Sequence, residues 1–165
     1  MAIQGAMPEK GRLTPHLIVR NAALAADFYR RALGAEELYS SPLPGGIGLH
    51  VHLKIGDTMV MVMDETPENF SEENFGGLRS PQSLGGASSL VEIVVDDVDA
   101  AFRRAVDAGA TPTLPVGDAF WGDRYGWITD PFGHIWALAT IREVLTPAQV
   151  EERMMAMMAA AQREE

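Results

Sequence analysis

The chain has 165 residues, of which 47% are hydrophobic, enough for one compact domain with a buried core. Its formal net charge of −10 argues against nucleic-acid binding, because phosphate binding needs clustered Lys and Arg. There is no apolar run of membrane-spanning length, no secretory signal at the N-terminus and no cysteine for a disulfide or thiolate ligand. We therefore expect a cytoplasmic protein that binds neither nucleic acid nor membrane.

The first half of the chain predicts a strand, a helix and three further strands. Residues 1–12 are small, polar and unpatterned, which is typical of a flexible tail. Residues 13–20 alternate as a strand does, and Asn21 is a suitable N-cap for a helix that Gly34 ends. Three strand-like runs follow, separated by glycine-containing turns, over residues 36–40, 47–55 and 58–64.

The pattern dissolves between Glu65 and Ser88. This segment is too long for an ordinary connection between secondary-structure elements. Phe70 and Phe75 would be unusual in a purely solvated linker, so we interpret the segment as a flap that packs back on the domain and partly covers it.

The second half repeats the first. Leu90–Val95 reads as a strand, and Asp97 caps a helix that Gly109 ends. Aligning Asn21 with Asp97 gives an offset of 76 residues (97 minus 21) and brings the two helix ends within one residue. Both halves therefore read β-α-β-β-β, which indicates an internal duplication. The remaining strands are predicted over residues 111–116, 125–129 and 134–140.

A last helix is predicted from Thr146, where a capping-box pattern is followed by Pro147. Its apolar stripe favours docking on the sheet or on a second subunit. The stripe consists of Val150, Met154, Met157 and Met158.

Two motifs stand near the end of the second half. Asp130-Pro131-Phe132-Gly133 reads as a tight turn between two strands, and the loop before it carries Trp121-Gly122-Asp123-Arg124. This WGDR-plus-DPFGH-x-W hairpin resembles the closing hairpin of the vicinal-oxygen-chelate superfamily, the glyoxalase/bleomycin-resistance/dioxygenase group, and looks most like its PhnB-like branch.

The resemblance implies an α+β fold in which two βαβββ modules form a cupped mixed sheet, with helices outside and a C-terminal helix added. Residues 13–145 would be one glyoxalase-like domain, with module one over about 13–65, the linker or flap over 66–88 and module two over about 89–145. Residues 146–165 would be the amphipathic helix. The resemblance also implies a homodimer.

Members of this superfamily typically bind Mn, Fe, Ni or Zn through two His and two Glu. Counting from the helix caps and the turn, those positions fall on Thr14, Met61, Leu90 and Ala137 in this chain. Apart from the weak donor Thr14, none of these side chains can bind a divalent ion. We therefore expect no metal at the standard site.

Other side chains on the same predicted faces offer an alternative. His16 and Glu92 are repeat-equivalent and lie two residues beyond the lost ligand positions, and His50 and His52 share a face of another strand. These four could hold Zn, Ni, Fe or Mn at a displaced site. Without a metal, Glu92 could act as a base with His16 as its partner.

Ligand-binding candidates complete the predicted pocket. Trp121 offers a stacking face and Arg124 a bidentate partner for a carboxylate or phosphonate, although Arg124 could instead brace the loop through Asp123. Trp127 and Trp136 are expected to pack against helices and His134 to hydrogen-bond within the hairpin. The binding candidates are His50, His52, Met61, Trp121, Asp123 and Arg124.

Two functions stay open on this evidence. One is an enzyme of the lyase, isomerase or dioxygenase type that acts on a small carbonyl or aromatic compound. The other is a non-catalytic binding or resistance protein that sequesters such a compound in a shaped pocket.

Overall fold

The computed structural model describes residues 13–66 and 77–163. The first βαβββ module comprises β1 (His16–Val19), α1 (Ala22–Leu33), β2 (Glu36–Pro42), β3 (Leu49–Ile55) and β4 (Thr58–Asp64), with a short 3-10 turn at Pro44–Gly46. The second comprises β5 (Leu90–Val94), α3 (Val98–Asp107), β6 (Thr111–Asp118), β7 (Asp123–Thr129) and β8 (Ile135–Ile141). Helix α2 (Pro81–Leu84) connects the modules, and α4 (Pro147–Ala161) follows the second.

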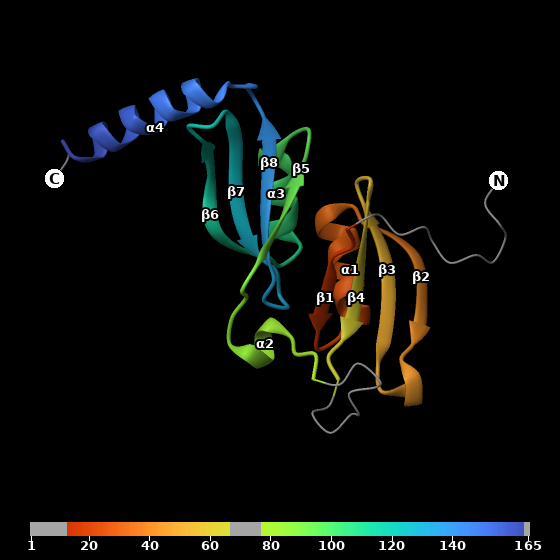
Figure 1. The fold of residues 1–165 in the computed structure, drawn as a ribbon. Helices are drawn as coiled ribbons and strands as arrows, with labels where there is room; N and C mark the ends of the chain where they lie inside the picture. The colour runs from red at the N-terminus through yellow and green to blue at the C-terminus, as the bar shows by residue number, and fades with distance from the viewer. Residues whose placement is uncertain (1–12, 67–76, 164–165) are drawn as a thin grey trace.

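Each module forms its own four-stranded mixed sheet. The strand orders are β1-β4-β3-β2 and β5-β8-β7-β6, and in both sheets the first strand pairs in parallel with the last while the other pairs are antiparallel. The edge strands β1 and β5 run in opposite directions along the boundary between the modules, which we call the seam (Figure 1). The predicted α+β fold of two βαβββ modules is therefore confirmed.

The duplication extends to individual hydrogen bonds. Asn21 and Asp97 cap α1 and α3 in the same way, each side chain accepting a bond from the backbone N–H three residues on. The first helical N–H of each module also donates to a side chain near the end of the last strand of that module. Ala22 N–H donates to Asp64 Oδ1 (2.6 Å), and Val98 N–H donates to the repeat-equivalent Thr140 Oγ1 (2.9 Å).

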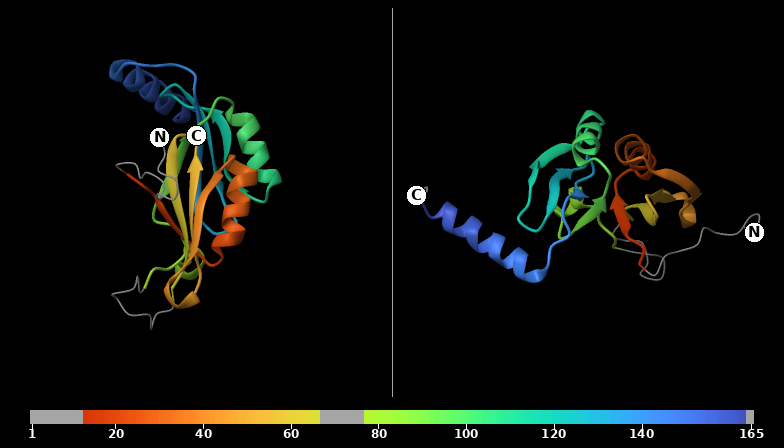
Figure 2. Two further views of the ribbon diagram at one scale, coloured as in Figure 1. Left: turned by 90° about the vertical axis from the view of Figure 1, so that its right-hand side faces the viewer. Right: turned by 90° about the horizontal axis from the view of Figure 1, so that it is seen from above.

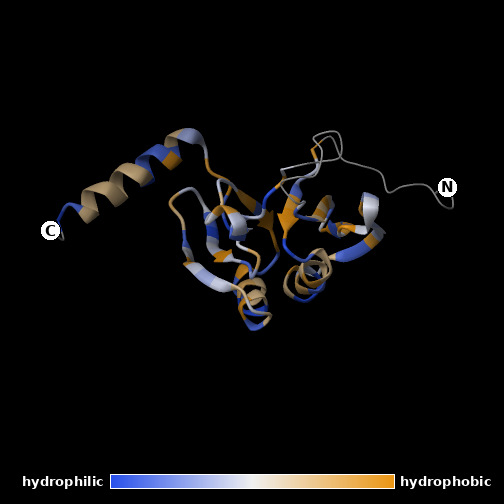
Figure 3. Ribbon diagram, turned by 90° about the horizontal axis from the view of Figure 1, so that it is seen from below, coloured by the Kyte–Doolittle hydropathy of each residue, from blue (hydrophilic) through white to orange (hydrophobic). Residues whose placement is uncertain are grey.

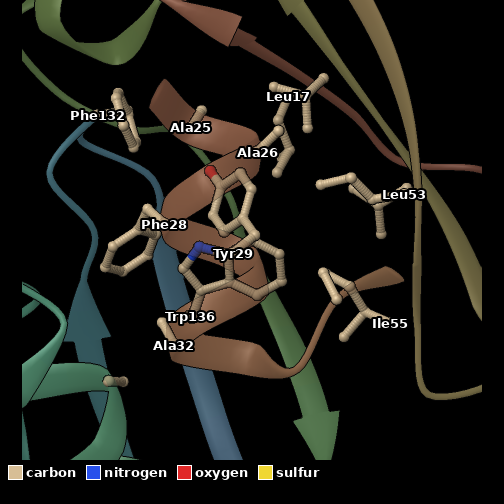
Figure 4. Packing of buried hydrophobic residues seen from close by; sticks show 14 of the residues in the cluster. Leu17, Ala25, Ala26, Phe28, Tyr29, Ala32, Leu53, Ile55, Phe132 and Trp136 are labelled. Atoms are coloured by element: carbon tan, nitrogen blue, oxygen red, sulfur yellow. The ribbon is translucent and has the colours of Figure 1, made fainter. Parts of the chain in front are cut away.

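Both helices cover the same side of the molecule. Seen from above, α1 and α3 lie side by side, with both sheets beneath them (Figure 2). Aromatic side chains of α1 pack against aromatic side chains of module two in the shared core (Figure 4). The ring of Tyr29 in α1 meets Trp136 in β8 edge to face at 5.4 Å, and Phe28 meets Phe132 at 6.1 Å.

A buried carboxylate ties this aromatic core together. Asp130 accepts hydrogen bonds from the Tyr29 hydroxyl (2.6 Å) and the Trp136 indole N–H (3.0 Å) through Oδ2. Its other oxygen accepts the backbone N–H groups of Phe132 and His134, both at 2.9 Å. The predicted turn residue therefore also joins module two to α1 of module one.

Several element bounds differ from those predicted. β1 begins only at His16 rather than at residue 13, because Pro15 has no N–H to donate to the ladder. β2 and β6 run two residues longer than predicted, since each continues its pairing with the neighbouring strand. The flap interpretation missed α2, which Ser80 caps. The predicted tail, Phe70 and Phe75 lie outside the described residues.

Helix α4 begins with the predicted capping box at Thr146 and runs away from both modules (Figure 1). None of its residues is buried, so its stripe does not dock on a sheet of the same chain as one alternative had it. Its outer part is coloured as apolar in Figure 3. In the described part of the chain, no helix has both the length and the apolar character needed to cross a membrane.

Candidate functional site

Strands β1 and β3, which flank β4, carry histidines on the sheet face turned away from α1. Leu17 points into the core beneath α1, so strand alternation turns its neighbour His16 to the other side. The strand register places both His16 and His52 opposite Met61. A row from His16 through Met61 to His52 therefore crosses three strands. We call this side of the sheet, which also carries His50 and Tyr39, the histidine face.

The rings on the histidine face lie close together. The His50 and His52 centroids are 4.7 Å apart, and the His16 ring lies 6.3 Å from that of His50 at an angle of 26°. Tyr39 meets the edge of His52 at 5.4 Å. His52 and Met61 are each 1% exposed, whereas His16 and Tyr39 are exposed at the rim. Met61 and His52 therefore form the buried base of this face, and the imidazoles of His16 and His50 are its accessible polar groups.

A cavity of about 480 Å³ adjoins this face at the end of the seam near α2. It is lined by His16, Ile18, Arg79, His134 and the segment 84–89, and we call it the His16 cavity. The His134 ring nitrogen Nε2 lies 2.9 Å from the backbone oxygen of Ile18, so this side chain joins the two modules. The predicted hydrogen bond was within the hairpin of His134 itself.

Helix α2 is held in place beside the His16 cavity from both modules. Glu65 accepts hydrogen bonds from Ser80 N–H (2.9 Å) and Ser83 Oγ–H (2.8 Å). Burial alone would raise the pKa of Glu65, but the bonds from Ser80 and Ser83 outweigh it and lower that pKa. On the other side Gly133, at φ 91°, approaches Pro81 so closely that an added Cβ would lie 2.9 Å from its Cβ.

The chemistry of the His16 cavity is basic and hydrogen-bonding. Imidazoles from both modules, the Arg79 guanidinium and the hydroxyls of Ser88 and Ser89 surround it. These groups can donate to a carboxylate or carbonyl oxygen. In a chain with a net charge of −10, the described lining of this cavity thus carries cationic and hydrogen-bonding groups without a carboxylate.

Glu92 lies elsewhere. Its register partner is Ala137, followed across the sheet by Trp127, on the face of module two turned away from α3. It lines a separate cavity of about 420 Å³ at the opposite end of the seam, which we call the Glu92 cavity. The structure therefore does not bring His16 and Glu92 into one cavity.

Trp121 and Asp123 belong to an aromatic surface on that same face of module two. The Trp121 indole N–H donates to Asp123 Oδ2 (2.9 Å), and its ring lies 4.8 Å from Tyr125. Trp127, at 6.2 Å from Tyr125, extends this surface and is half-buried. The prediction that Trp127 packs against a helix is thus wrong, because its neighbours Gly126 and Ile128 occupy the helix side.

Arg124 faces the opposite way. It forms a bidentate ion pair with Asp99 in the first turn of α3, with Nε–Oδ2 at 2.7 Å and NH2–Oδ1 at 2.9 Å, and a further contact with Asp118 at 3.1 Å. The hydrogen bond from Arg124 lowers the pKa of Asp99. Arg124 braces α3, and its partners differ from the predicted Asp123.

The family model of the glyoxalase/bleomycin resistance protein/dioxygenase superfamily matches residues 11–138 of this chain. The chain belongs to this superfamily. The uncharacterized protein Mb0911c of Mycobacterium bovis is 45% identical over 133 residues, covering 80% of this chain and 85% of that protein.

Solved structures share the fold of this chain. TioX from Micromonospora sp. ML1 is 25% identical, with a TM-score of 0.58 over 79% of this chain and 98% of TioX. A PhnB protein from Bacillus cereus is 18% identical, with a TM-score of 0.56 over 79% of this chain and 99% of its own. The predicted resemblance to the superfamily, including PhnB-like proteins, is confirmed.

The positions that the resemblance assigns to metal ligands are Thr14, Met61, Leu90 and Ala137, of which only Thr14 carries an oxygen donor in its side chain. Met61 lies buried on the histidine face, and Leu90 and Ala137 lie on the aromatic side of module two. Thioether, isobutyl and methyl groups do not fit a hard or borderline divalent ion. Across residues 13–66 and 77–163, no three His, Asp or Glu side chains are grouped to hold one, either here or at the alternative set of His16, His50, His52 and Glu92.

Sequence reasoning expected residues 65–88 to act as a partial cover, but it missed Arg79 as a lining residue and the role of His134 in the His16 cavity. Arg79 lies in the stretch without periodicity, so nothing local marked it. His134 could have been found from the repeat, because the offset of 76 residues pairs it with Thr58 at the start of β4, next to β1.

Proposed function

We propose that the protein binds a small organic molecule that carries a ring and a carboxylate or carbonyl group. One observation carries the proposal: His16 lines the His16 cavity and also contacts His50 on the histidine face. The acidic or carbonyl end would lie against the basic groups of the cavity. The ring would lie against the imidazoles of His16 and His50, which have accessible surface.

Binding without chemistry is the function that we favour for this site. The predicted acid–base pair is divided, because His16 and Glu92 line different cavities. The described lining of the His16 cavity contains imidazole, guanidinium and hydroxyl groups but no carboxylate. Such a lining supports recognition of an anion more directly than proton abstraction by a carboxylate base.

We also propose that the chain is a homodimer. The stripe on α4 is half-buried at Val150 and Met154 but exposed at Met157 (52%) and Met158 (50%), where the helix runs past the body of its own chain. An isolated helix of 15 residues is marginal in water, so α4 gains stability if a second copy covers its stripe.

The ligand proposal can be tested with benzoate and its neutral analogue benzyl alcohol. We expect benzoate to bind more tightly and to perturb the amide resonances of Ser88 and Ser89 in a ¹H–¹⁵N spectrum. His16→Gln should weaken benzoate by about tenfold, since one hydrogen bond to a charged group is lost. The control is Glu92→Gln at the repeat-equivalent position. Equal affinities for both probes, or no effect of His16→Gln, would contradict the proposal.

Metal analysis tests the absence of the superfamily metal independently. The protein is purified without chelators and its metal content is measured. We expect a content far below one equivalent. Stoichiometric Zn, Ni, Fe or Mn, lost on Glu92→Gln, would show a displaced metal site and favour the enzyme.

The dimer proposal calls for sedimentation equilibrium on the full chain and on the double variant Met157→Glu, Met158→Glu. The native chain should have twice the mass of a 17.9 kDa protomer, and the variant should dissociate. Leu24→Glu on α1 is the matched control, because Leu24 is 61% exposed on another helix. A native chain that sediments as a monomer would end the proposal.

A further inference from the structure

The two cavities at the ends of the seam are related by the internal repeat. The offset of 76 residues pairs His16 with Glu92 and Ile18 with Val94. The first member of each pair lines the His16 cavity, and the second lines the Glu92 cavity. His134 and Thr58 are paired in the same way, across the two modules. The duplication has therefore produced two equivalent hollows on either side of one approximate twofold axis.

Their chemistry has diverged in charge. The Glu92 cavity has an apolar wall made by Leu13, Pro15, Val60, Val91 and Trp136. Its charged lining groups among the described residues are the carboxylates of Glu92 and Asp57, the latter in the turn between β3 and β4. The cavity of basic groups at one end is thus matched by an apolar cavity with carboxylates at the other.

We propose that the Glu92 cavity is a second ligand site, for a compact hydrophobic amine. Its volume of about 420 Å³ lies in the range of small-molecule sites. The apolar wall would hold the hydrocarbon body, and the Glu92 carboxylate would pair with the ammonium group. Glu92 is exposed, so its carboxylate stays hydrated without ligand and can exchange water for an ammonium donor.

The seam then selects ligands of opposite charge at its two ends. An acid is held by imidazole and guanidinium at the His16 cavity, and an amine is held by carboxylate at the Glu92 cavity. This second site does not depend on the function proposed for the first, because the two cavities are lined by different residues.

The test uses benzylamine, with benzyl alcohol as the neutral analogue of the same shape, on the full chain at pH 7. Affinities come from amide shifts in ¹H–¹⁵N spectra. Benzylamine should shift the resonances of Val91 to Val94 and bind more tightly than the alcohol. Glu92→Gln should weaken benzylamine by about fivefold to tenfold and leave the alcohol unchanged.

Glu37→Gln provides the matched control, since Glu37 is an exposed glutamate on β2 of the other module. It should leave benzylamine affinity unchanged. The proposal is overturned if benzylamine binds no better than the alcohol, if Glu92→Gln and Glu37→Gln act alike, or if the shifts centre on Ser88 and Ser89. Because benzoate reports on Ser88 and Ser89 and benzylamine on β5, failure of one site is distinguishable from failure of the other.

Discussion

The two modules share a backbone plan but not their surfaces. Both helices begin at an Asx cap, and both first helical N–H groups donate to a side chain near the end of β4 or β8. On the faces turned away from the helices, module one presents histidines and methionines, and module two presents Trp121, Tyr125 and Trp127. The bonds that form the module are thus common to both repeats, whereas the faces available to ligands differ.

The modules also differ at the turn before the last strand. Module two has the buried Asp130, which binds Tyr29 and Trp136, while the repeat-equivalent position in module one is the exposed Lys54. Among the described residues, the turn of module two thus joins the modules through Asp130, whereas Lys54 forms no such bond in module one. The Arg104 side chain adds another link, donating to the backbone oxygen of Ala32 at 3.0 Å.

The largest loss of stability is expected when the Asp130 carboxylate, which joins the modules, is removed. Asp130→Ala leaves the buried Tyr29 hydroxyl and Trp136 N–H without their acceptor, so the free energy of unfolding should fall by about 3–5 kcal/mol. Lys54→Ala at the equivalent position should change it by no more than about 0.5 kcal/mol. Urea denaturation of the three proteins measures both. Similar losses in the two variants would show that the turns do not differ in the way described.

Smaller losses of stability are expected at the hydrogen bonds to the first helical N–H, which both modules share. Asp64→Ala removes the acceptor of Ala22 N–H (2.6 Å) and Leu49 N–H (2.8 Å) and should cost about 2–3 kcal/mol. Thr140→Val keeps the shape but removes the bond from Val98 N–H and the bond to the Val95 backbone oxygen, and should cost about 1–2 kcal/mol. Urea midpoints give the ranking. A larger loss for Thr140→Val would contradict the equivalence of the two caps.

The features shared by the modules were also those that the sequence could predict. Asn21, Asp97 and Thr146 were placed as caps, and all three are caps in the structure, because capping needs only residues three positions apart. Strand alternation likewise placed His50 and His52 on one face of their strand, where the structure has them. Capping and strand alternation both depend on residues only a few positions apart, so a single sequence is enough to apply them.

The features that distinguish the modules depend on distant partners and were not predictable in this way. Asp130 meets Tyr29 across 101 positions, and Arg124 meets Asp99 across 25. The separation of His16 from Glu92 depends on how the modules lie along the seam, which periodicity does not specify. α2 is a single turn whose position depends on Glu65 and Gly133, so a propensity pattern could not reveal it.

The stability that the Tyr29–Asp130 hydrogen bond contributes should depend on pH in the alkaline range. Burial, followed by the charge of Asp130, raises the pKa of Tyr29 well above 10. The phenol thus ionises in the unfolded chain near pH 10 while it stays protonated in the folded one. Its contribution to stability is present below about pH 10 and is lost as the pH rises toward the folded pKa.

Tyr29→Phe tests this contact directly. At pH 7 it should cost about 1.5–2 kcal/mol, one hydrogen bond to a charged acceptor. Its unfolding free energy should then decline less steeply than that of the native protein between about pH 9 and pH 11. Tyr39→Phe, on the rim of the histidine face, is the control. Parallel alkaline slopes for the native protein and Tyr29→Phe would show that this phenol does not govern the decline.

The smallest effect is expected at the brace between β7 and α3, which has no counterpart bond in module one among the described residues. Asp99→Asn keeps the shape but removes the charge that pairs with Arg124, and Asp118 remains as a partner. The hydrogen bond from Arg124 lowers the pKa of Asp99, so the stability it contributes is present above the unfolded value near pH 4 and is lost as the pH falls through the folded pKa. The native protein should therefore be slightly more stable than Asp99→Asn at pH 7, with the difference closing at pH 3 and shrinking in high salt, where exposed pairs are screened. Urea midpoints at both pH values measure the difference in stability.

A difference that persists at pH 3 would mean that Asp99 stabilises α3 through its shape rather than its charge. A loss of benzoate affinity in Asp99→Asn would mean that the brace also positions the ligand site, which the separation of Arg124 from the His16 cavity argues against.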